Sequence, residues 1–176
     1  MSTSFPTGNK TRDVHALLAR GLEEELLLLQ NFIALLQREQ QALTGGDIQL
    51  MLSLGDEKSR LATQLSLSAE RRNSQLATVG FSSDRSGVES WIDQMAQVTT
   101  QTSSPTSSIR EQWSELLTLA AQARDLNETN GRLIGMHLQH NQQALNTLLS
   151  ATHQAMLYGP DGQAQAAHSG RLFGSA

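Results

Sequence analysis

The fold is decided by residues 22–54, which read LEEELLLLQNFIALLQREQQALTGGDIQLMLSL. Apolar side chains recur here in alternating steps of four and three residues, the repeat of helices that pack along one another. Further apolar residues beside this repeat, such as Phe32 and Leu35, widen the apolar face beyond a two-stranded seam. The pattern predicts a helix over residues 12–43 that belongs to a helical bundle.

The run Thr44-Gly45-Gly46-Asp47 is typical of a turn between two helices. Glycine adopts the left-handed conformation that ends a helix, and an aspartate side chain accepts hydrogen bonds from the free amides that begin the next one. We therefore assign structural roles to Gly45, Gly46 and Asp47. Because the turn is short, a second helix over residues 48–76 is expected to run antiparallel to the first.

Two more helices are predicted beyond this hairpin. Residues 87–98 have one apolar face and predict a short helix, which is followed by a hydroxyl-rich loop over 99–107. Ser108 and Glu111 form a capping box that is expected to open a helix running to about Tyr158. The fold class is therefore all-α, an elongated antiparallel bundle of long helices.

The domain organisation follows from these elements. Residues 1–11 are polar and are expected to form a loose leader. We predict one long-helix bundle domain over residues 1–158 and a flexible tail over 159–176. The last helix would reach roughly 75 Å and exceed each hairpin helix by about 30 Å, so one end is expected to overhang or bend. An overhanging end would leave an apolar stripe uncovered.

The predicted inward stripe of this last helix contains polar residues and a glycine. Its positions are Trp113, Leu117, Ala120, Arg124, Asn127, Gly131, Ile134, Leu138, Asn141, Leu145, Leu148 and Thr152. A buried asparagine in such a stripe fixes the pairing register at a cost in stability. We assign register or bundle-structural roles to Asn127, Asn130, Gly131 and Asn141; the alternative, that Asn127 and Asn141 face solvent, remains open.

Composition excludes several classes of function. The formal net charge of -4 offers no basic surface for nucleic acid, and a chain without cysteine has no disulfide, thiolate metal site or cysteine nucleophile. The N-terminus lacks the apolar region of a secretory signal, and the longest leucine run, residues 26–29, is far shorter than the ~20 residues of a membrane span. We expect a cytoplasmic protein without stable membrane insertion.

Groups that could perform chemistry are sparse. His137 and His140 have a spacing that suits two metal ligands on one helix face, but no acidic residue lies at a neighbouring turn. Phosphate-binding and serine-nucleophile motifs are missing, and no histidine has the sequence setting of a phosphotransfer bundle. The sequence predicts a non-enzyme without metal or cofactor. A self-associating structural or signalling adaptor and a metal-dependent helical enzyme are the competing hypotheses.

Three stretches carry a resemblance to a known family. The first is the acidic, leucine-rich helix before Gly45-Gly46-Asp47 with its continuation at Leu50, Leu54, Glu57, Lys58 and Leu61. The second is LNETNGRLI at 126–134, followed by Asn141 and Leu145, and the third is YGPDGQ at 158–163. In this order and spacing, residues 14–163 resemble the FlgN family, the cytosolic chaperones of flagellar type III export.

The resemblance implies a function and a set of residues. Proteins of this family bind the hook–filament junction proteins FlgK and FlgL and deliver them to the export gate protein FlhA. The family engages its substrates chiefly through the C-terminal helical region, and a tyrosine near the end of the long helix contributes to gate docking. By position, the docking residue is Tyr158. The substrate contacts are expected at Leu145, Leu148, Leu149, Met156 and Leu157. The alternative, that the same leucines pack on the bundle itself, remains open.

Overall fold

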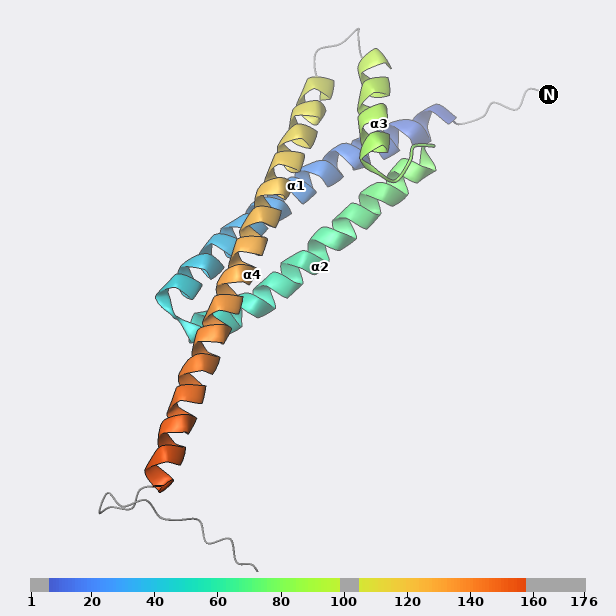
Figure 1. Cartoon of the computed structure of the whole chain (residues 1–176). Helices are drawn as coiled ribbons and strands as arrows, with labels where there is room; N and C mark the ends of the chain where they lie inside the picture. The colour runs from blue at the N-terminus through green and yellow to red at the C-terminus, as the bar shows by residue number, and fades with distance from the viewer. Residues whose placement is uncertain (1–6, 99–104, 158–176) are drawn as a thin grey trace, which may run out of the picture. The chain divides into compact units, whose positions relative to one another are not determined.

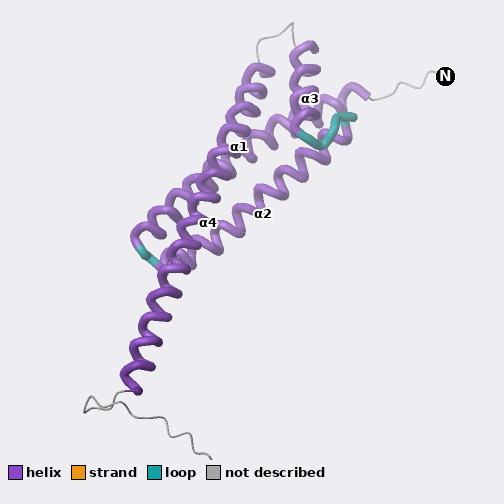
Figure 2. The backbone as a smooth tube through the Cα atoms, in the orientation of Figure 1, coloured by secondary structure: helices purple, strands orange, loops and turns teal. Residues whose placement is uncertain are grey.

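A computed structural model of the chain describes residues 7–98 and 105–157, and within these ranges all regular secondary structure is helical (Figures 1 and 2). The helices are α1 (Thr7–Gly45), α2 (Ile48–Thr78), α3 (Arg85–Val98) and α4 (Pro105–Leu157). The prediction of an all-α fold with a long last helix is confirmed. The predicted tail, residues 159–176, lies outside the described residues.

The chain divides into two compact units, Met1–Gly131 and Arg132–Ala176. The first contains α1, α2, α3 and the beginning of α4, and the second contains the rest of α4. The division falls inside one uninterrupted helix of 53 residues. The prediction of one domain over residues 1–158 therefore stays a prediction.

The turn between α1 and α2 forms as the sequence predicts. Gly46 has a φ of +69°, and the amides of Gly46 and Asp47 donate to the carbonyl oxygens of Leu43 (3.3 Å) and Ala42 (3.0 Å). This is the Schellman arrangement that ends a helix with a left-handed glycine. The Asp47 carboxylate then accepts from the Leu50 amide at 3.0 Å and caps α2. As a result, α1 and α2 run antiparallel and side by side (Figure 1).

The core of the first unit is built from leucine, isoleucine and tryptophan. One cluster joins all four helices, and its fully buried members include Leu22 and Leu36 of α1, Leu76 of α2 and Trp91 of α3. Trp113 of α4 is 7% exposed and belongs to the same cluster. A second, smaller cluster lies near the hairpin turn and consists of Leu35, Ala42 and Leu54. Burial of this apolar area is what stabilises the first unit.

The connection from α2 to α3 contains a C-cap that ends α2 and an N-cap that begins α3. Gly80, with a φ of +86°, donates to Ala77 O at 3.1 Å, and Phe81 donates to Leu76 O at 3.0 Å, which ends α2 with a second Schellman motif. Asp84 then caps α3, because its carboxylate accepts from the Gly87 amide at 2.8 Å.

Residues 105–131 of α4 run parallel to α1. Three hydrogen bonds join the two helices, and both residue numbers rise together along them: Gln112 to Glu23 (3.3 Å), Gln30 to Glu115 (3.4 Å) and Asn130 to Leu36 O (2.8 Å). This part of α4 is consequently antiparallel to α2.

The first and last helices begin several residues earlier than predicted, whereas α2 and α3 agree with prediction to within two residues at each end. The first helix begins at Thr7 and not at Arg12, so residues 7–11 are helical and are not part of a loose leader. The last helix begins at Pro105, three residues before the predicted capping box, and Ser108 therefore lies inside the helix. Proline suits the first turn of a helix because its fixed φ is helical and its missing N–H would have no partner there.

Candidate protein-binding surface

The second unit presents an exposed apolar helix face. Within residues 132–151 of α4, Leu138 and Leu148 are each 65% exposed, and Leu145 and Leu149 are each 50% exposed. Ile134 is half-buried on the same face. The alternating steps of four and three residues continue through this segment. In the first unit this repeat buries its apolar side chains, whereas here the side chains are left accessible.

The structure describes only part of the predicted substrate-binding set. Leu145, Leu148 and Leu149 lie on the exposed face. Met156 and Leu157 lie in the last turn of α4, but their side chains are outside the description. Tyr158, the predicted gate-docking residue, lies outside the described residues.

The asparagines of α4 occupy different environments. Asn127 and Asn141 are exposed, which agrees with the alternative that the sequence leaves open. Asn130 is fully buried, and Gly131 is exposed and has no atom of another side chain within 4 Å of the position that a Cβ would occupy. The buried stripe follows Trp113, Leu116, Ala123 and Asn130. The predicted stripe departs from it at Leu117, because Leu116 and Leu117 fit the repeat equally well.

Asn130 belongs to a buried polar cluster that connects three helices. Its amide nitrogen donates to Leu36 O at 2.8 Å and to Glu39 Oε2 at 2.7 Å. Glu39, whose side chain is 5% exposed, accepts two hydrogen bonds from Lys58 Nζ at 2.8 and 2.9 Å. We call Glu39, Lys58 and Asn130 the polar clip. It fixes α4 against the hairpin, because any other register leaves the Glu39 carboxylate without these donors.

Sequence reasoning missed Glu39 as a partner in this clip. The available signal was Lys58, which falls on the inward stripe of the second helix, Met51, Leu54, Lys58, Leu61 and Leu65. A lysine on a buried stripe needs a carboxylate nearby. Glu39 is its counterpart across the hairpin.

A second polar cluster lies farther along the hairpin. Arg72 pairs with the buried Glu25, and its guanidinium lies 5.4 Å from the ring centroid of Trp113. A guanidinium over an indole face is attracted by the ring quadrupole. This cluster joins α1, α2 and α4 in the same way as the polar clip, and it is structural.

Among the described side chains, two titratable groups have shifted pKa values, and both belong to the first unit. Burial lowers the pKa of His15, whose Nδ1 accepts from Trp91 Nε1–H at 2.5 Å in a stacked pair. Hydrogen bonds from Ser82, from the Gly87 amide and from Ser86 lower the pKa of Asp84. These shifts follow from helix packing and capping.

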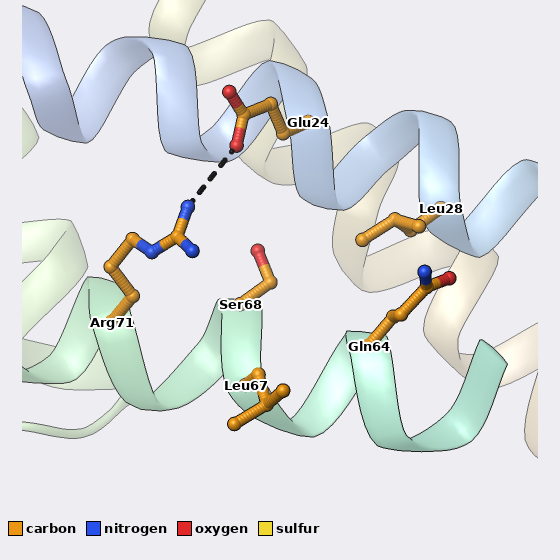
Figure 3. A pocket seen from close by; sticks show the side chains of 6 residues that line it. All are labelled: Glu24, Leu28, Gln64, Leu67, Ser68 and Arg71. Carbon is orange, nitrogen blue, oxygen red and sulfur yellow. Dashed lines mark ion pairs between the residues drawn. The ribbon is translucent and has the colours of Figure 1, made fainter. Parts of the chain in front are cut away.

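The pocket shown in Figure 3 lies between α1 and α2 and has a volume of about 220 Å³. Its lining residues come from both helices: Glu24, Leu28, Gln64, Leu67, Ser68 and Arg71. Its two charged groups, Glu24 and Arg71, form an exposed ion pair at 3.5 Å. Because small-molecule sites usually have volumes of about 300–1,000 Å³, this pocket is too small and too open to favour a substrate.

The two histidines of α4 do not form a metal centre with other ligands. His137 and His140 line a shallow pocket with Leu133 and Met136. Among the side chains that the structure describes, those of residues 13–97 and 108–151, no three histidine, cysteine or acidic groups lie close enough together to hold a metal ion. A helix long and apolar enough to span a membrane is likewise not found in those ranges.

The fold and this surface define an all-helical protein with an exposed apolar helix face and, in the described part of the chain, no assembled catalytic group. The FlgN protein family matches residues 16–166, and the chain belongs to this family. FlgN proteins are flagella synthesis proteins and not enzymes.

Full-length relatives support this membership. The flagella synthesis protein FlgN of Yersinia enterocolitica serotype O:8 / biotype 1B is 32% identical over 85% of this chain and 90% of its own length. The FlgN proteins of Salmonella typhimurium LT2 and Escherichia coli K12 are 29% and 27% identical, each over 87% of this chain and 94% of their own. No solved structure is significantly similar to the chain.

Proposed function

We propose that this protein is a cytoplasmic chaperone of flagellar type III export that binds the hook–filament junction proteins FlgK and FlgL. It then delivers them to the export gate protein FlhA. Membership of the FlgN family supports a role in flagellar synthesis. The observation that carries the chaperone role is the exposed apolar face of α4, with Leu145, Leu148 and Leu149 at its centre.

The chemistry of this face suits the binding of another helix. Leucines at steps of three and four residues insert into the groove of an amphipathic partner, as in helix-in-groove recognition. Burial of such side chains contributes roughly 1.5–3 kcal/mol each. A junction protein whose own apolar helix is covered in this way is protected from aggregation before assembly, and no bond has to be made or broken.

Delivery to the gate is assigned to Tyr158, which follows the last turn of α4. An aromatic side chain with a hydroxyl group is well suited to an interface, because its ring buries apolar area while the hydroxyl keeps a polar partner. Binding of substrate and gate by adjacent segments would raise the local concentration of substrate at the gate.

The decisive experiment measures binding to purified FlgK and FlgL. Leu148→Glu is expected to weaken binding by at least roughly tenfold, because it places a charge in the centre of the apolar face. The matched control is Leu52→Glu, since Leu52 is also a helical leucine and is 68% exposed, but on α2. Equal effects of the two substitutions would remove the support for this face as the binding site.

The role of Tyr158 in binding the export gate protein is tested in the same assay. Tyr158→Ala is expected to leave binding of FlgK and FlgL unchanged and to weaken binding of FlhA. If FlhA binds the variant as tightly as the unaltered chain, Tyr158 is not a docking residue.

Sedimentation of the protein alone tests the competing hypothesis, because a concentration-independent dimer without affinity for FlgK or FlgL favours a self-associating adaptor.

A further inference from the structure

The last part of α4 contains no permanently charged side chain. Arg132 is followed by 25 residues, 133–157, without Asp, Glu, Lys or Arg. At the chain's overall charged fraction of 17%, a stretch of this length would hold about four. Its polar positions are instead filled by amide, hydroxyl and imidazole side chains, such as Gln142, Asn146 and His140.

The lack of charge extends to the positions where partner choice is usually encoded. The stripe, read at steps of four and three, is Ile134, Leu138, Asn141, Leu145 and Leu148. The positions that flank it are His137, Ala144 and Ala151 on one side and Gly135, Gln142 and Leu149 on the other. In paired helices these flanks usually carry Glu and Lys, whose ion pairs select the partner and its orientation. Here they carry small, apolar or neutral polar groups.

A charged partner side chain would gain little on this surface. It would lose water on docking and would meet no opposite charge among residues 133–151 to compensate for the loss. Charge complementarity therefore favours a neutral contact face on the partner. Asn141 adds one requirement, because its amide would be covered by the docked helix and needs a hydrogen-bonding group opposite it.

We propose that residues 133–151 bind one amphipathic helix whose contact face carries no charged side chain and places a neutral hydrogen-bonding group opposite Asn141. The inference rests on the chaperone function proposed above and specifies the kind of segment recognised. Affinity then arises from apolar contact and neutral hydrogen bonds, and ion pairs make no contribution.

The test places either sign of charge at one flank and measures binding to FlgK and FlgL. Ala144→Lys and Ala144→Glu are both expected to weaken binding, each by roughly tenfold. The controls are Gln143→Lys and Gln143→Glu, which carry the same charges on the adjacent exposed residue, at the opposite helix face. These controls are expected to bind within about twofold of the unaltered chain, since their charges remain in water.

Salt dependence supplies an independent readout. The dissociation constant of the unaltered chain is expected to change by less than about twofold between about 50 mM and about 500 mM NaCl, because screening acts only on charge–charge attraction. Tighter binding by either Ala144 variant, or a dissociation constant that rises tenfold with salt, would show a charged partner face and overturn the inference. Tighter binding by Asn141→Leu would show that the partner has no hydrogen-bonding group opposite that residue.

The outcomes also separate this inference from the proposed function. If the unaltered chain binds neither junction protein, both proposals fail. If the chain instead forms a dimer that Ala144→Lys dissociates, the face pairs two copies of this protein, and again both fail. Binding of FlgK or FlgL with opposite responses to Ala144→Lys and Ala144→Glu retains the chaperone function and rejects the neutral partner face alone.

Discussion

Removal of the lysine from the polar clip is expected to destabilise the first unit far more than removal of a surface cation. In Lys58→Met the stem of the side chain still packs, but the Glu39 carboxylate, 5% exposed, loses a donor at 2.8 Å and keeps the Asn130 amide at 2.7 Å. Loss of one partner from a buried ion pair costs about 3–5 kcal/mol. Lys58 is itself 25% exposed, and this partial solvation reduces the expected loss to about 2–3 kcal/mol.

The assay is urea unfolding followed by far-ultraviolet circular dichroism, with the unfolding slope compared between variants. The matched control is Arg38→Met. Arg38 pairs with Glu57 across the same two helices at 3.4 Å, but these side chains are 53% and 36% exposed. Exposed pairs contribute about 0–1 kcal/mol, so Arg38→Met is expected to have little effect.

A third variant tests whether the uncompensated charge causes the loss. Glu39→Gln combined with Lys58→Met leaves no buried charge in the clip, and the double variant is expected to be more stable than Lys58→Met alone. Equal free energies of unfolding for Lys58→Met and Arg38→Met would refute the reasoning. A double variant less stable than Lys58→Met would refute it as well.

Two further predictions concern α3. Nδ1 of His15 accepts a hydrogen bond from Trp91, so the folded protein holds this imidazole in its neutral form, and burial lowers the His15 pKa. The neutral imidazole therefore contributes stability that is complete above the unfolded pKa of about 6.5. This contribution is lost as the pH falls from there toward the lower pKa of the folded state. Urea midpoints measured from about pH 8 to about pH 5 should therefore fall less steeply in His15→Phe, and parallel profiles would contradict this. Gly87→Ala would place a Cβ 1.8 Å from Ser82 O, so the free energy of unfolding is expected to fall by about 1–3 kcal/mol. An unchanged midpoint of thermal unfolding would show that the loop before α3 moves aside without a cost in stability.

The four helices and the hairpin turn were predictable because each depends on local sequence. Apolar periodicity identified all four helices, and Gly46 and Asp47 have the backbone conformation and capping bond expected for their residue types. The register of α4 was not predictable in this way. Leu116 and Leu117 both satisfy the apolar repeat, and the choice between them depends on side chains that α1 contributes from 80 or more residues away.

In the candidate surface and the adjoining part of α4, some features likewise follow from the sequence of the helix itself, and others depend on contacts with residues far away in the chain. The leucines of the exposed face follow directly from the repeat, and Leu145, Leu148 and Leu149 are exposed in the structure. The buried state of Asn130 depends on the Leu36 carbonyl and the Glu39 carboxylate. No pattern within α4 distinguishes Asn130 from the exposed Asn127.

The positions of the two tryptophans make the intrinsic fluorescence of the protein selective. Trp91 of α3 stacks on His15 of α1, and Trp113 of α4 lies next to the guanidinium of Arg72 of α2, so both indoles belong to the first unit. Residues 132–157 contain neither tryptophan nor tyrosine. Indole emission therefore reports the packing of α3 and α4 against the hairpin. A ligand that occupies only the apolar face beyond Gly131 should leave this emission unchanged, so its binding can be followed through a fluorophore on the ligand while the indole emission reports whether the first unit stays folded.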